Sequence, residues 1–331
     1  MRIIVYGVGA IGGVLAVSLG RAGHEIVGIA RGAQLEAIRR GGLLLRLPDG
    51  EERAEFECVG DPSEIDFRPD DAILLTMKTQ DTQAALERLR AAGVTTQPVF
   101  CAQNGIANDD MALRLFANVF SVVVELPADY SEPGVVTSYF APVRGVLHVG
   151  RHGTGSDEAG KALADAFNGA GFAAFFHADI LPLRYAKLTR NLGNAVSAVM
   201  DDRALAEPYV AAAQAEAREV FSRAGIVPAD IDVVDGGKRP ELREVPGVTR
   251  MGSSSAQSLL RGAGSIETDY LNGEIVLMGR RLGVPTPVNA WFAERAHRML
   301  REEKLPGSVP IEDIRAALPG IGCQESTDRI G

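Results

Sequence analysis

The run GVGAIG near the start of the chain has the glycine spacing of a turn that holds the pyrophosphate of a dinucleotide. In such a turn Gly7 lets the chain bend sharply, and Gly9 lets the backbone approach a phosphate without a Cβ in the way. Gly12 lets the following helix pack closely on the preceding strand, and the helix N-terminus offers free N–H groups. The alternative is a turn that binds nothing. The candidate cofactor ligands here are Gly7, Val8, Gly9, Ala10, Ile11 and Gly12.

A lysine and two asparagines stand at helical spacing in the segment LPLRYAKLTRNLGNAVSAVMD. Lys187, Asn191 and Asn194 are at i, i+4 and i+7, so a single helix reaching Met200 would carry all three on one face. An ammonium and two amides are costly to bury without polar partners. The three residues therefore form either a solvated surface stripe or a donor-rich strip that lines a cleft between two domains.

The elements that would position the glycine turn can be read from its flanks. Residues 3–20 are almost uninterruptedly apolar, as in a signal peptide or a membrane helix, but glycines punctuate the run and Arg2 is the only early charge. Ile3–Tyr6 is β-branched and aromatic, which favours a short buried parallel strand. A strand, a glycine turn and a small-residue helix over residues 11–19 form the first unit of a Rossmann fold. We therefore expect neither export nor membrane insertion.

A second apolar strand is expected at residues 26–30, and Arg31 follows it. The residue that ends this strand reads the adenosine ribose: an acidic side chain selects NAD, whereas a cation accepts the 2′-phosphate of NADP. Arg31, with Arg39 and Arg40 further along, therefore favours NADP. A solvated surface arginine is the alternative.

Two further polar residues follow predicted strands. Lys78 comes after the apolar run 71–77, and Asn104 comes after the run 98–102. In an open α/β sheet ligands bind outside the carboxyl ends of the strands, so both residues are expected to face the cofactor crevice. Taken alone, Lys78 would be an ordinary surface lysine and Asn104 part of a plain turn. Their equivalent places favour the functional interpretation.

The remainder of the first half is β-rich. Residues 41–58 alternate apolar and polar residues around Pro48-Asp49-Gly50, which predicts a hairpin. The β-rich runs between residues 119 and 149 are expected to continue the same sheet with antiparallel or mixed strands. His148 and His152 lie in or just after the last run, and we interpret them as structural because nothing pairs them with a nucleophile.

After residue 178 the composition becomes helical. The predicted fold is therefore α/β, with an N-terminal Rossmann-type dinucleotide-binding domain (1–178) followed by an all-α domain (179–305) and a tail (306–331). Ser253 to Ser255 can cap a helix and also donate to a carboxylate. Glu267 precedes another amphipathic helix and could be merely a charge that complements the helix dipole. The tail contains a short helix candidate at 311–318 and is expected to be peripheral or mobile.

Composition excludes several function classes. The chain has 331 residues, and its 34 basic against 43 acidic side chains give a formal charge of −9 without a basic run, which argues against general nucleic-acid binding. Three dispersed cysteines and five scattered histidines show neither a disulfide framework nor the spacing of metal ligands. We therefore expect no metal and a reducing, cytoplasmic location.

Taken together, these motifs resemble the ketopantoate reductase family (2-dehydropantoate 2-reductases) over about residues 1 to 300. The matching stretches, in order, are GVGAIGG at 7–13, the lysine of MKTQDT, QNG at 103–105, KLxxN at 187–191 and SS…IETDYLNGE at 254–274. Members of that family bind NADPH in the Rossmann domain and a 2-keto acid in a cleft beside the helical domain. The family also suggests a homodimer.

The resemblance implies a role for each matching residue. The glycine turn and Arg31 would hold the pyrophosphate and the 2′-phosphate, with Lys78 and Asn104 also at the cofactor. Lys187 would be the general acid, which donates a proton to the alkoxide formed as hydride reaches a ketone carbon. Glu267 would contact both cofactor and substrate. Asn191 and Ser255 would be substrate ligands, and Asn194 and Ser254 beside them are further candidates for the substrate.

Two departures from the family pattern lie on the substrate side. The family often has an asparagine eight residues after the lysine, but this chain has Ala195 there and Asn194 one place off. The family's SSMLQD is here SSAQSL, residues 254–259. The predicted function is NADPH-dependent reduction of a 2-keto acid, with ketopantoate the first candidate. The alternatives are another 2-keto acid, or a non-catalytic NADP sensor, which would not need a proton donor.

Overall fold

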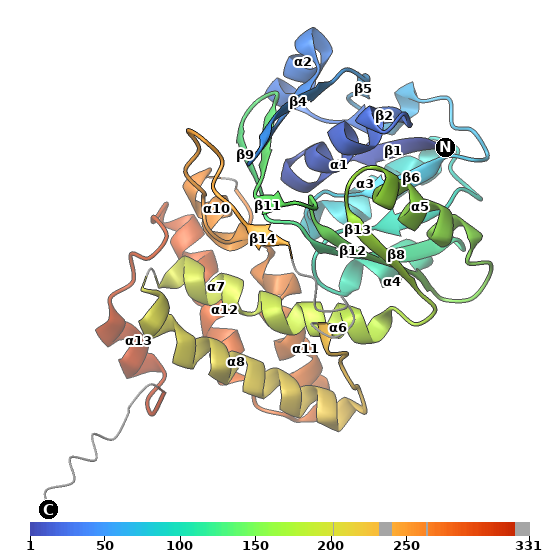
Figure 1. Cartoon of the computed structure of the whole chain (residues 1–331). Coiled ribbons are helices and arrows are strands. Elements are labelled where there is room, and N and C mark those ends of the chain that lie inside the picture. The colour runs from blue at the N-terminus through green and yellow to red at the C-terminus, as the bar shows by residue number, and fades with distance from the viewer. Residues whose placement is uncertain (201, 232–239, 263, 322–331) are drawn as a thin grey trace, which may run out of the picture. The chain divides into compact units, whose positions relative to one another are not determined.

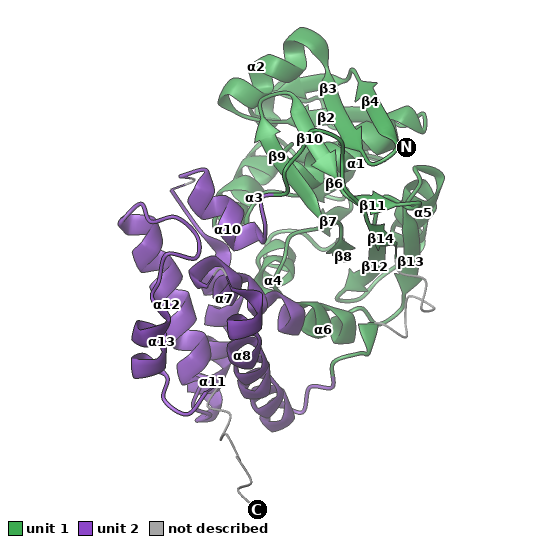
Figure 2. Ribbon diagram, turned by 60° about the vertical axis from the view of Figure 1, so that its left-hand side comes forward, with its two compact units in different colours: residues 1–187, 228–250 green, residues 188–227, 251–331 purple. Residues whose placement is uncertain are grey.

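The computed structural model describes residues 1–200, 202–231, 240–262 and 264–321 (Figure 1). The chain forms two compact units, coloured separately in Figure 2. The Rossmann unit combines residues 1–187 with 228–250, and the helical unit combines residues 188–227 with 251–331. The division falls after residue 187 rather than 178, since Leu183 and Ala186 still pack against Val123 of the Rossmann unit.

An eight-stranded sheet forms the centre of the Rossmann unit, in the order β13-β12-β8-β7-β6-β1-β2-β5. Neighbouring strands are parallel except for the antiparallel pair β8 and β12. A mostly parallel sheet of this kind places its strand ends, and the loops that follow them, along one edge. The strands are β1 (Arg2–Tyr6), β2 (Glu25–Ile29), β5 (Glu57–Val59), β6 (Ala72–Leu75), β7 (Val99–Cys101), β8 (Val119–Glu125), β12 (Val146–His152) and β13 (Ala173–His177).

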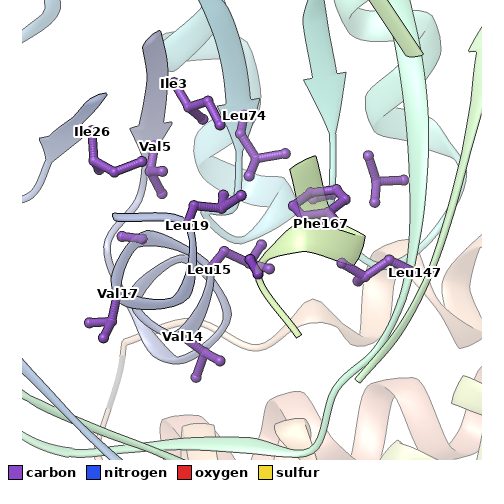
Figure 3. Packing of buried hydrophobic residues seen from close by; sticks show 14 of the residues in the cluster. Ile3, Val5, Val14, Leu15, Val17, Leu19, Ile26, Leu74, Leu147 and Phe167 are labelled. Carbon is purple, nitrogen blue, oxygen red and sulfur yellow. The ribbon is translucent and has the colours of Figure 1, made fainter. Parts of the chain in front are cut away.

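Helices cover the sheet, and β1 is buried on both faces. Ile3 and Val5 belong to the core shared with α1 and α5, part of which is drawn in Figure 3, whereas Ile4 and Tyr6 belong to the core that holds α3. Burial on both faces explains why β1 is an unbroken apolar run rather than an alternating one. The helices of this part are α1 (Ala10–Arg21), α2 (Gly32–Gly41), α3 (Thr82–Ala91), α4 (Ala107–Leu113) and α5 (Glu158–Gly169).

A second, smaller sheet lies beside α1 and has the order β4-β3-β10-β9. The predicted hairpin is present as β3 (Leu43–Leu47) and β4 (Gly50–Ala54), antiparallel with Leu47 opposite Gly50. The expectation that all strands from 119 to 149 continue the main sheet is wrong for β9 (Ala128–Glu132) and β10 (Val135–Ser138), which pair with each other and, through β10, with β3.

The physical reason for this second sheet is a contact with α1. A Cβ on Gly13 would lie 2.7 Å from Val136 Cγ1, so the missing side chain lets β10 pack directly on the helix. A further short pair joins β11 (Phe140–Ala141) to β14 (Glu241–Leu242).

Within its described residues the helical unit contains helices only, and the expected α/β Rossmann-type domain followed by an all-α domain is confirmed. Tyr209 and Phe292 pack edge to face at its core, with ring centroids 5.9 Å apart. None of the described helices combines the length and the apolarity that a membrane span requires. The helices are α7 (Gly193–Val199), α8 (Arg203–Ala224), α10 (Ser254–Leu260), the 3-10 helix η3 (Glu267–Tyr270), α11 (Asn272–Leu282), α12 (Pro287–Arg301) and α13 (Ile311–Ala317).

The predicted helix 181–200 is present as α6 (Leu181–Asn191) followed by α7, and Leu192 between them keeps helical dihedrals of φ −59° and ψ −29°. The described part of the tail packs on the helical unit: Ile314 of α13 is fully buried, and the Gly307 amide donates to the Ala198 carbonyl at 3.0 Å. Residues 322–331 of the predicted tail lie outside the described residues.

Candidate active site

The three glycines of the turn after β1 meet three different surroundings. Gly7 has φ +103°, and a Cβ there would lie 2.6 Å from the Met77 amide nitrogen. A Cβ on Gly12 would lie 2.4 Å from both the Gly7 carbonyl oxygen and Thr76 Oγ1. A Cβ on Gly9, by contrast, would meet nothing within 4 Å. Gly9 thus leaves open space at the N-terminus of α1, where an anion gains from free N–H groups and the helix dipole.

Two polar side chains that the sequence reasoning missed hold this turn in place. Thr76 Oγ1 lies 2.9 Å from the Gly7 carbonyl oxygen and donates to it. Gln34 is buried on α2, where its Nε2 donates to the Val8 carbonyl at 2.9 Å and its Oε1 accepts from the Gly134 amide at 2.7 Å. No motif marks Gln34, because its partners stand 26 and 100 residues away in the chain.

The predicted cofactor residues follow four adjacent strands of the main sheet. In the order β7-β6-β1-β2, these strands lead to Asn104, Lys78, the glycine turn and Arg31. The carboxyl ends of adjacent parallel strands share one edge, so the residues predicted from separate motifs gather there. A turn open at Gly9, a helix N-terminus and flanking cations fit a dinucleotide with charged phosphates.

Arg31 is the N-cap residue of α2, and its side chain is 57% exposed. Its guanidinium lies 4.0 Å from Asp81 Oδ1, an exposed pair that contributes little to stability. Burial raises the pKa of the neighbouring Tyr6, and the Arg31 charge opposes that rise. Arg31 therefore lies close to Tyr6, the last residue of β1.

A buried amide joins the loops that carry Lys78 and Asn104. Asn108 Nδ2 donates to the Asn104 carbonyl at 3.0 Å and to Thr79 Oγ1 at 3.1 Å, while its Oδ1 accepts from Thr82 Oγ1 at 2.8 Å. Asn108 is fully buried. Because one amide holds both loops, Lys78 and Asn104 keep a fixed relation to each other.

Lys187 lies near the end of α6 and is partly buried. One turn earlier on the same helix, the buried Arg184 pairs with Asp109 and reaches the Gln103 carbonyl. Lys187 is also close enough to His148 to affect its titration. Burial above all, then the neighbouring His177 and Lys187, lowers the pKa of His148 to about 3.

The histidines were interpreted as structural, and their contacts agree with that. His148 Nδ1 lies 2.9 Å from His177 Nε2, and its ring stacks on Phe175 with centroids 5.5 Å apart. His152 pairs with the exposed Asp110 at 2.8 Å.

The predicted substrate residues of the helical unit come from adjoining elements. Ser253 Oγ lies 3.2 Å from the Asn194 carbonyl oxygen, which brings α10 against α7. Asn272 Nδ2 donates to the Leu192 carbonyl at 3.1 Å, which brings the start of α11 to the start of α7. Asn191 is 7% exposed, whereas Asn194, near the start of α7, is partly exposed.

The family asparagine missing at Ala195 has no counterpart in space at that position. Ala195 is fully buried, and Asn194 beside it is partly exposed. An asparagine at 195 would therefore face the interior of the helical unit in this chain.

The three consecutive serines, Ser253 to Ser255, have different surroundings. Ser253 caps α10, since its Oγ accepts from the Ala256 amide at 3.3 Å, and Ser254 is partly exposed. Ser255 is 1% exposed, yet its Oγ has no hydrogen-bond partner among the described residues. A buried hydroxyl without a partner costs stability, and such groups in native proteins call for an explanation in terms of function.

Glu267 opens η3 and is 7% exposed. It is therefore more than a solvated charge at a helix start, because burial of a carboxylate requires compensation by polar partners. Across the described residues, no group of three or more His, Cys, Asp or Glu side chains is arranged to hold a metal ion.

Two stretches of the chain match known sequence families. Residues 3–153 match the family described as Ketopantoate reductase PanE/ApbA, and residues 179–299 match Ketopantoate reductase PanE/ApbA C terminal. The chain belongs to the ketopantoate reductase family. As a member it is an NADP-dependent oxidoreductase, so the family, the fold and the cofactor class expected from the sequence are confirmed.

Relatives of the ketopantoate reductase family match nearly end to end. The 2-dehydropantoate 2-reductase of Archaeoglobus fulgidus is 29% identical over 299 residues, which cover 87% of this chain and 94% of the relative. A PanE/ApbA family ketopantoate reductase from Ralstonia eutropha JMP134 is 28% identical, covers 92% of this chain and 99% of its own, and superposes with a TM-score of 0.75. The structure of D-mandelate dehydrogenase with NADH and anilino(oxo)acetate superposes with a TM-score of 0.78. It is 23% identical, and the match covers 92% of this chain and 99% of that chain, so the two are alike in fold.

Proposed function

We propose that this protein reduces a 2-keto acid to the corresponding 2-hydroxy acid with NADPH, and that 2-dehydropantoate (ketopantoate) is the acid. The curated relatives are named for this reaction, and the departures at Ala195 and in residues 254–259 do not remove the groups it needs. One observation carries the proposal: Lys187 stands partly buried on α6, the helix tied by Arg184 to the loop of the cofactor residue Asn104.

The reaction requires a hydride, a proton and a held substrate. When bound, NADPH supplies the hydride from C4 of its nicotinamide to C2 of the keto acid. Lys187 donates a proton from its ammonium Nζ to the ketone oxygen, which becomes the new hydroxyl, and the neutral amine then takes a proton from water. General acid catalysis of this kind contributes ~10²–10⁴-fold, and the positive charge stabilises the developing alkoxide as well.

Substrate orientation is assigned to polar groups of the helical unit. The Ser255 hydroxyl, which has no partner among the described residues, would donate to the carboxylate of the keto acid. Asn191, one turn after Lys187, would hold the carbonyl, and Glu267 would accept from a hydroxyl of substrate or cofactor. Fixing the substrate in this way replaces orientational entropy that would otherwise raise the barrier.

The test is the decay of NADPH absorbance with ketopantoate in wild type and in Lys187→Ala. We expect the variant to lose ~10²–10⁴-fold in kcat while it still binds NADPH. The matched control is Lys161→Ala. Lys161 belongs to α5 and lies over the Phe176 ring, and its removal should leave the wild-type kcat unchanged. Turnover close to wild type in Lys187→Ala would rule out the assigned proton donor.

A panel of 2-keto acids in the same assay decides the substrate. Higher kcat/KM with benzoylformate or another aryl keto acid than with ketopantoate would replace the proposed substrate and keep the chemistry. If the protein binds NADPH tightly but turns over none of the acids, the proposed reductase activity is wrong and the alternative of a non-catalytic NADP sensor is favoured.

A further inference from the structure

Arg184 is a buried cation on the helix that carries Lys187. Its side chain is 3% exposed, and that of its partner Asp109 on α4 is 1% exposed. Arg184 Nε and Nη2 donate to Asp109 Oδ2 at 2.8 and 2.5 Å, and Nη1 donates to the Gln103 carbonyl oxygen at 2.8 Å. One guanidinium thus ties α6, α4 and the loop after β7 together.

Stability alone is a poor reason for this arrangement. A buried ion pair loses hydration that its mutual attraction only partly offsets, and well-packed apolar residues are often as stabilising. What the guanidinium adds is a rigid, planar fork whose bonds fix direction as well as distance. The pair is therefore better suited to setting the position of α6 than to holding the unit folded.

The contacts of Arg184 lie next to two residues of the proposed site, Lys187 and Asn104. Arg184 precedes Lys187 by three positions, so the two side chains leave α6 one turn apart on neighbouring parts of its surface. The carbonyl that Arg184 holds belongs to Gln103, the residue directly before Asn104. The Asn108 amide also binds this loop, because its Nδ2 donates to the Asn104 carbonyl oxygen.

We propose that Arg184 and Asp109 are positioning residues for the reduction: they hold the general acid Lys187 in a fixed relation to the cofactor loop at Asn104. The inference rests on the proposed role of Lys187. A displacement of the proton donor by about 1 Å can cost ~10²-fold in rate, and a helix free to turn about its axis permits displacements of this size.

The chain contains a matched control for the pair. Arg2, at the start of β1, donates through Nε and Nη2 to the two carboxylate oxygens of Asp71 at 2.6 Å each, and through Nη2 to the Asp66 carbonyl at 2.7 Å. This is also a buried arginine–carboxylate pair with one backbone acceptor, in the same unit, although both oxygens of Asp71 accept whereas Arg184 bonds only Oδ2 of Asp109. It lies at the amino end of β1, whereas the predicted cofactor residues follow the carboxyl ends of the strands.

The experiment compares Arg184→Lys with Arg2→Lys, each assayed at a temperature where it is fully folded. Both variants keep the charge and lose the fork, so we expect similar falls in Tm. Arg184→Lys should lose ~10²-fold in kcat with saturating NADPH and ketopantoate, with the Kd for NADPH within about threefold of wild type. The deuterium isotope effect from 4-deuterated NADPH should rise, because hydride transfer becomes more rate-limiting. Arg2→Lys should keep the wild-type kcat.

Asp109→Asn is the second variant, for the case that Arg184→Lys does not fold. It keeps an acceptor for the guanidinium and removes the charge, and we expect about a tenfold loss in kcat. A kcat within threefold of wild type in folded Arg184→Lys, or in Asp109→Asn, overturns the positioning role. If Lys187→Ala retains turnover the proposed function fails first, whereas inactive Lys187→Ala beside fully active Arg184→Lys rejects this inference alone.

Discussion

A Cβ on Gly12 would lie 2.4 Å from the carbonyl oxygen of Gly7. The first helical turn of α1 therefore rests on the end of β1 with no space for a methyl group. Gly9, between the two, has open space instead. The same short motif thus combines one glycine needed for packing with one whose surroundings leave space for a ligand, and substitutions should separate the two.

Gly12→Ala should destabilise the Rossmann unit, and Gly9→Ala should not. The first forces a methyl group against Gly7 and Thr76, a case of overpacking that costs roughly 1–3 kcal/mol. The second adopts a negative φ of −96° without a clash, but it puts a methyl group where a pyrophosphate would approach. Thermal unfolding and NADPH titration of each variant check this.

The control for both is Gly169→Ala, at the C-terminal end of α5, where a Cβ also meets nothing within 4 Å. It should leave NADPH affinity unchanged and should not lower Tm, because alanine favours a helix more than glycine does. Normal NADPH affinity in Gly9→Ala would contradict the assignment of the turn to the pyrophosphate.

Arg31→Ala should reduce the preference for NADPH over NADH. A hydrogen bond to a charged group contributes about 1.5–3 kcal/mol, so loss of the contact to a 2′-phosphate should lower kcat/KM for NADPH by about 10- to 150-fold. The value for NADH, which lacks that phosphate, should stay the same. Steady-state kinetics with both cofactors measure it, with the exposed Arg90→Ala on α3 as the control. Equal losses with both cofactors would contradict the 2′-phosphate role.

Ser255→Ala should weaken substrate binding without loss of stability. The Ser255 hydroxyl is buried and has no partner among the described residues, so its removal relieves an unmet hydrogen bond and should leave Tm unchanged or raised. If the hydroxyl binds the substrate carboxylate, KM for ketopantoate should rise about tenfold.

Ser258→Ala on the same helix is the opposite case. Ser258 is equally buried, but its Oγ donates to the Ser254 carbonyl at 2.9 Å, so this variant should lose about 1 kcal/mol of stability and keep the wild-type KM. An unchanged KM in Ser255→Ala would remove Ser255 from the substrate site.

His148 should make the protein less stable in mild acid. Its pKa is lowered to about 3 in the folded state, so between about pH 6.5 and 3 the unfolded chain binds a proton that the folded chain does not. The stability associated with the neutral ring is present above pH 6.5 and is lost as pH falls, at about 1.4 kcal/mol per pH unit. Burial lowers the pKa of His177 as well, which acts in the same direction.

Urea unfolding at pH 7.5 and pH 5.0 measures this effect. His148→Leu should remove about 2 kcal/mol of the pH-dependent loss over that range. Phe175→Leu removes the ring stacked on His148 but not the titrating group, so it should keep the wild-type pH dependence. The same pH dependence in His148→Leu and wild type would contradict the buried, neutral histidine.

The sequence predicts a residue's role where that role depends on residues nearby in the chain. The turn at 7–12 is recognisable because a strand, its glycines and a helix follow each other within twenty residues, and each has a local preference. Arg31, Lys78 and Asn104 could be assigned to one edge because parallel strands share the direction of their ends. The hairpin around residues 48–50 is local in the same sense.

Contacts between distant segments were not accessible to sequence reasoning. Nothing local in β10 distinguishes a strand of the main sheet from one that pairs with β3, and Val136 reaches α1 only because Gly13 leaves space.

By itself, then, the sequence determined the Rossmann-type turn, the all-α second part, the family and the cofactor class, because each rests on residues close together in the chain or on ordered motifs. The tertiary structure alone decided which side chains support them. Arg184 and Asp109 are 75 residues apart, and Gln34 meets Gly134 across 100 residues. Such pairs form only when the chain has folded, since a buried charge or amide finds its partner through the packing of whole elements and not through local preference.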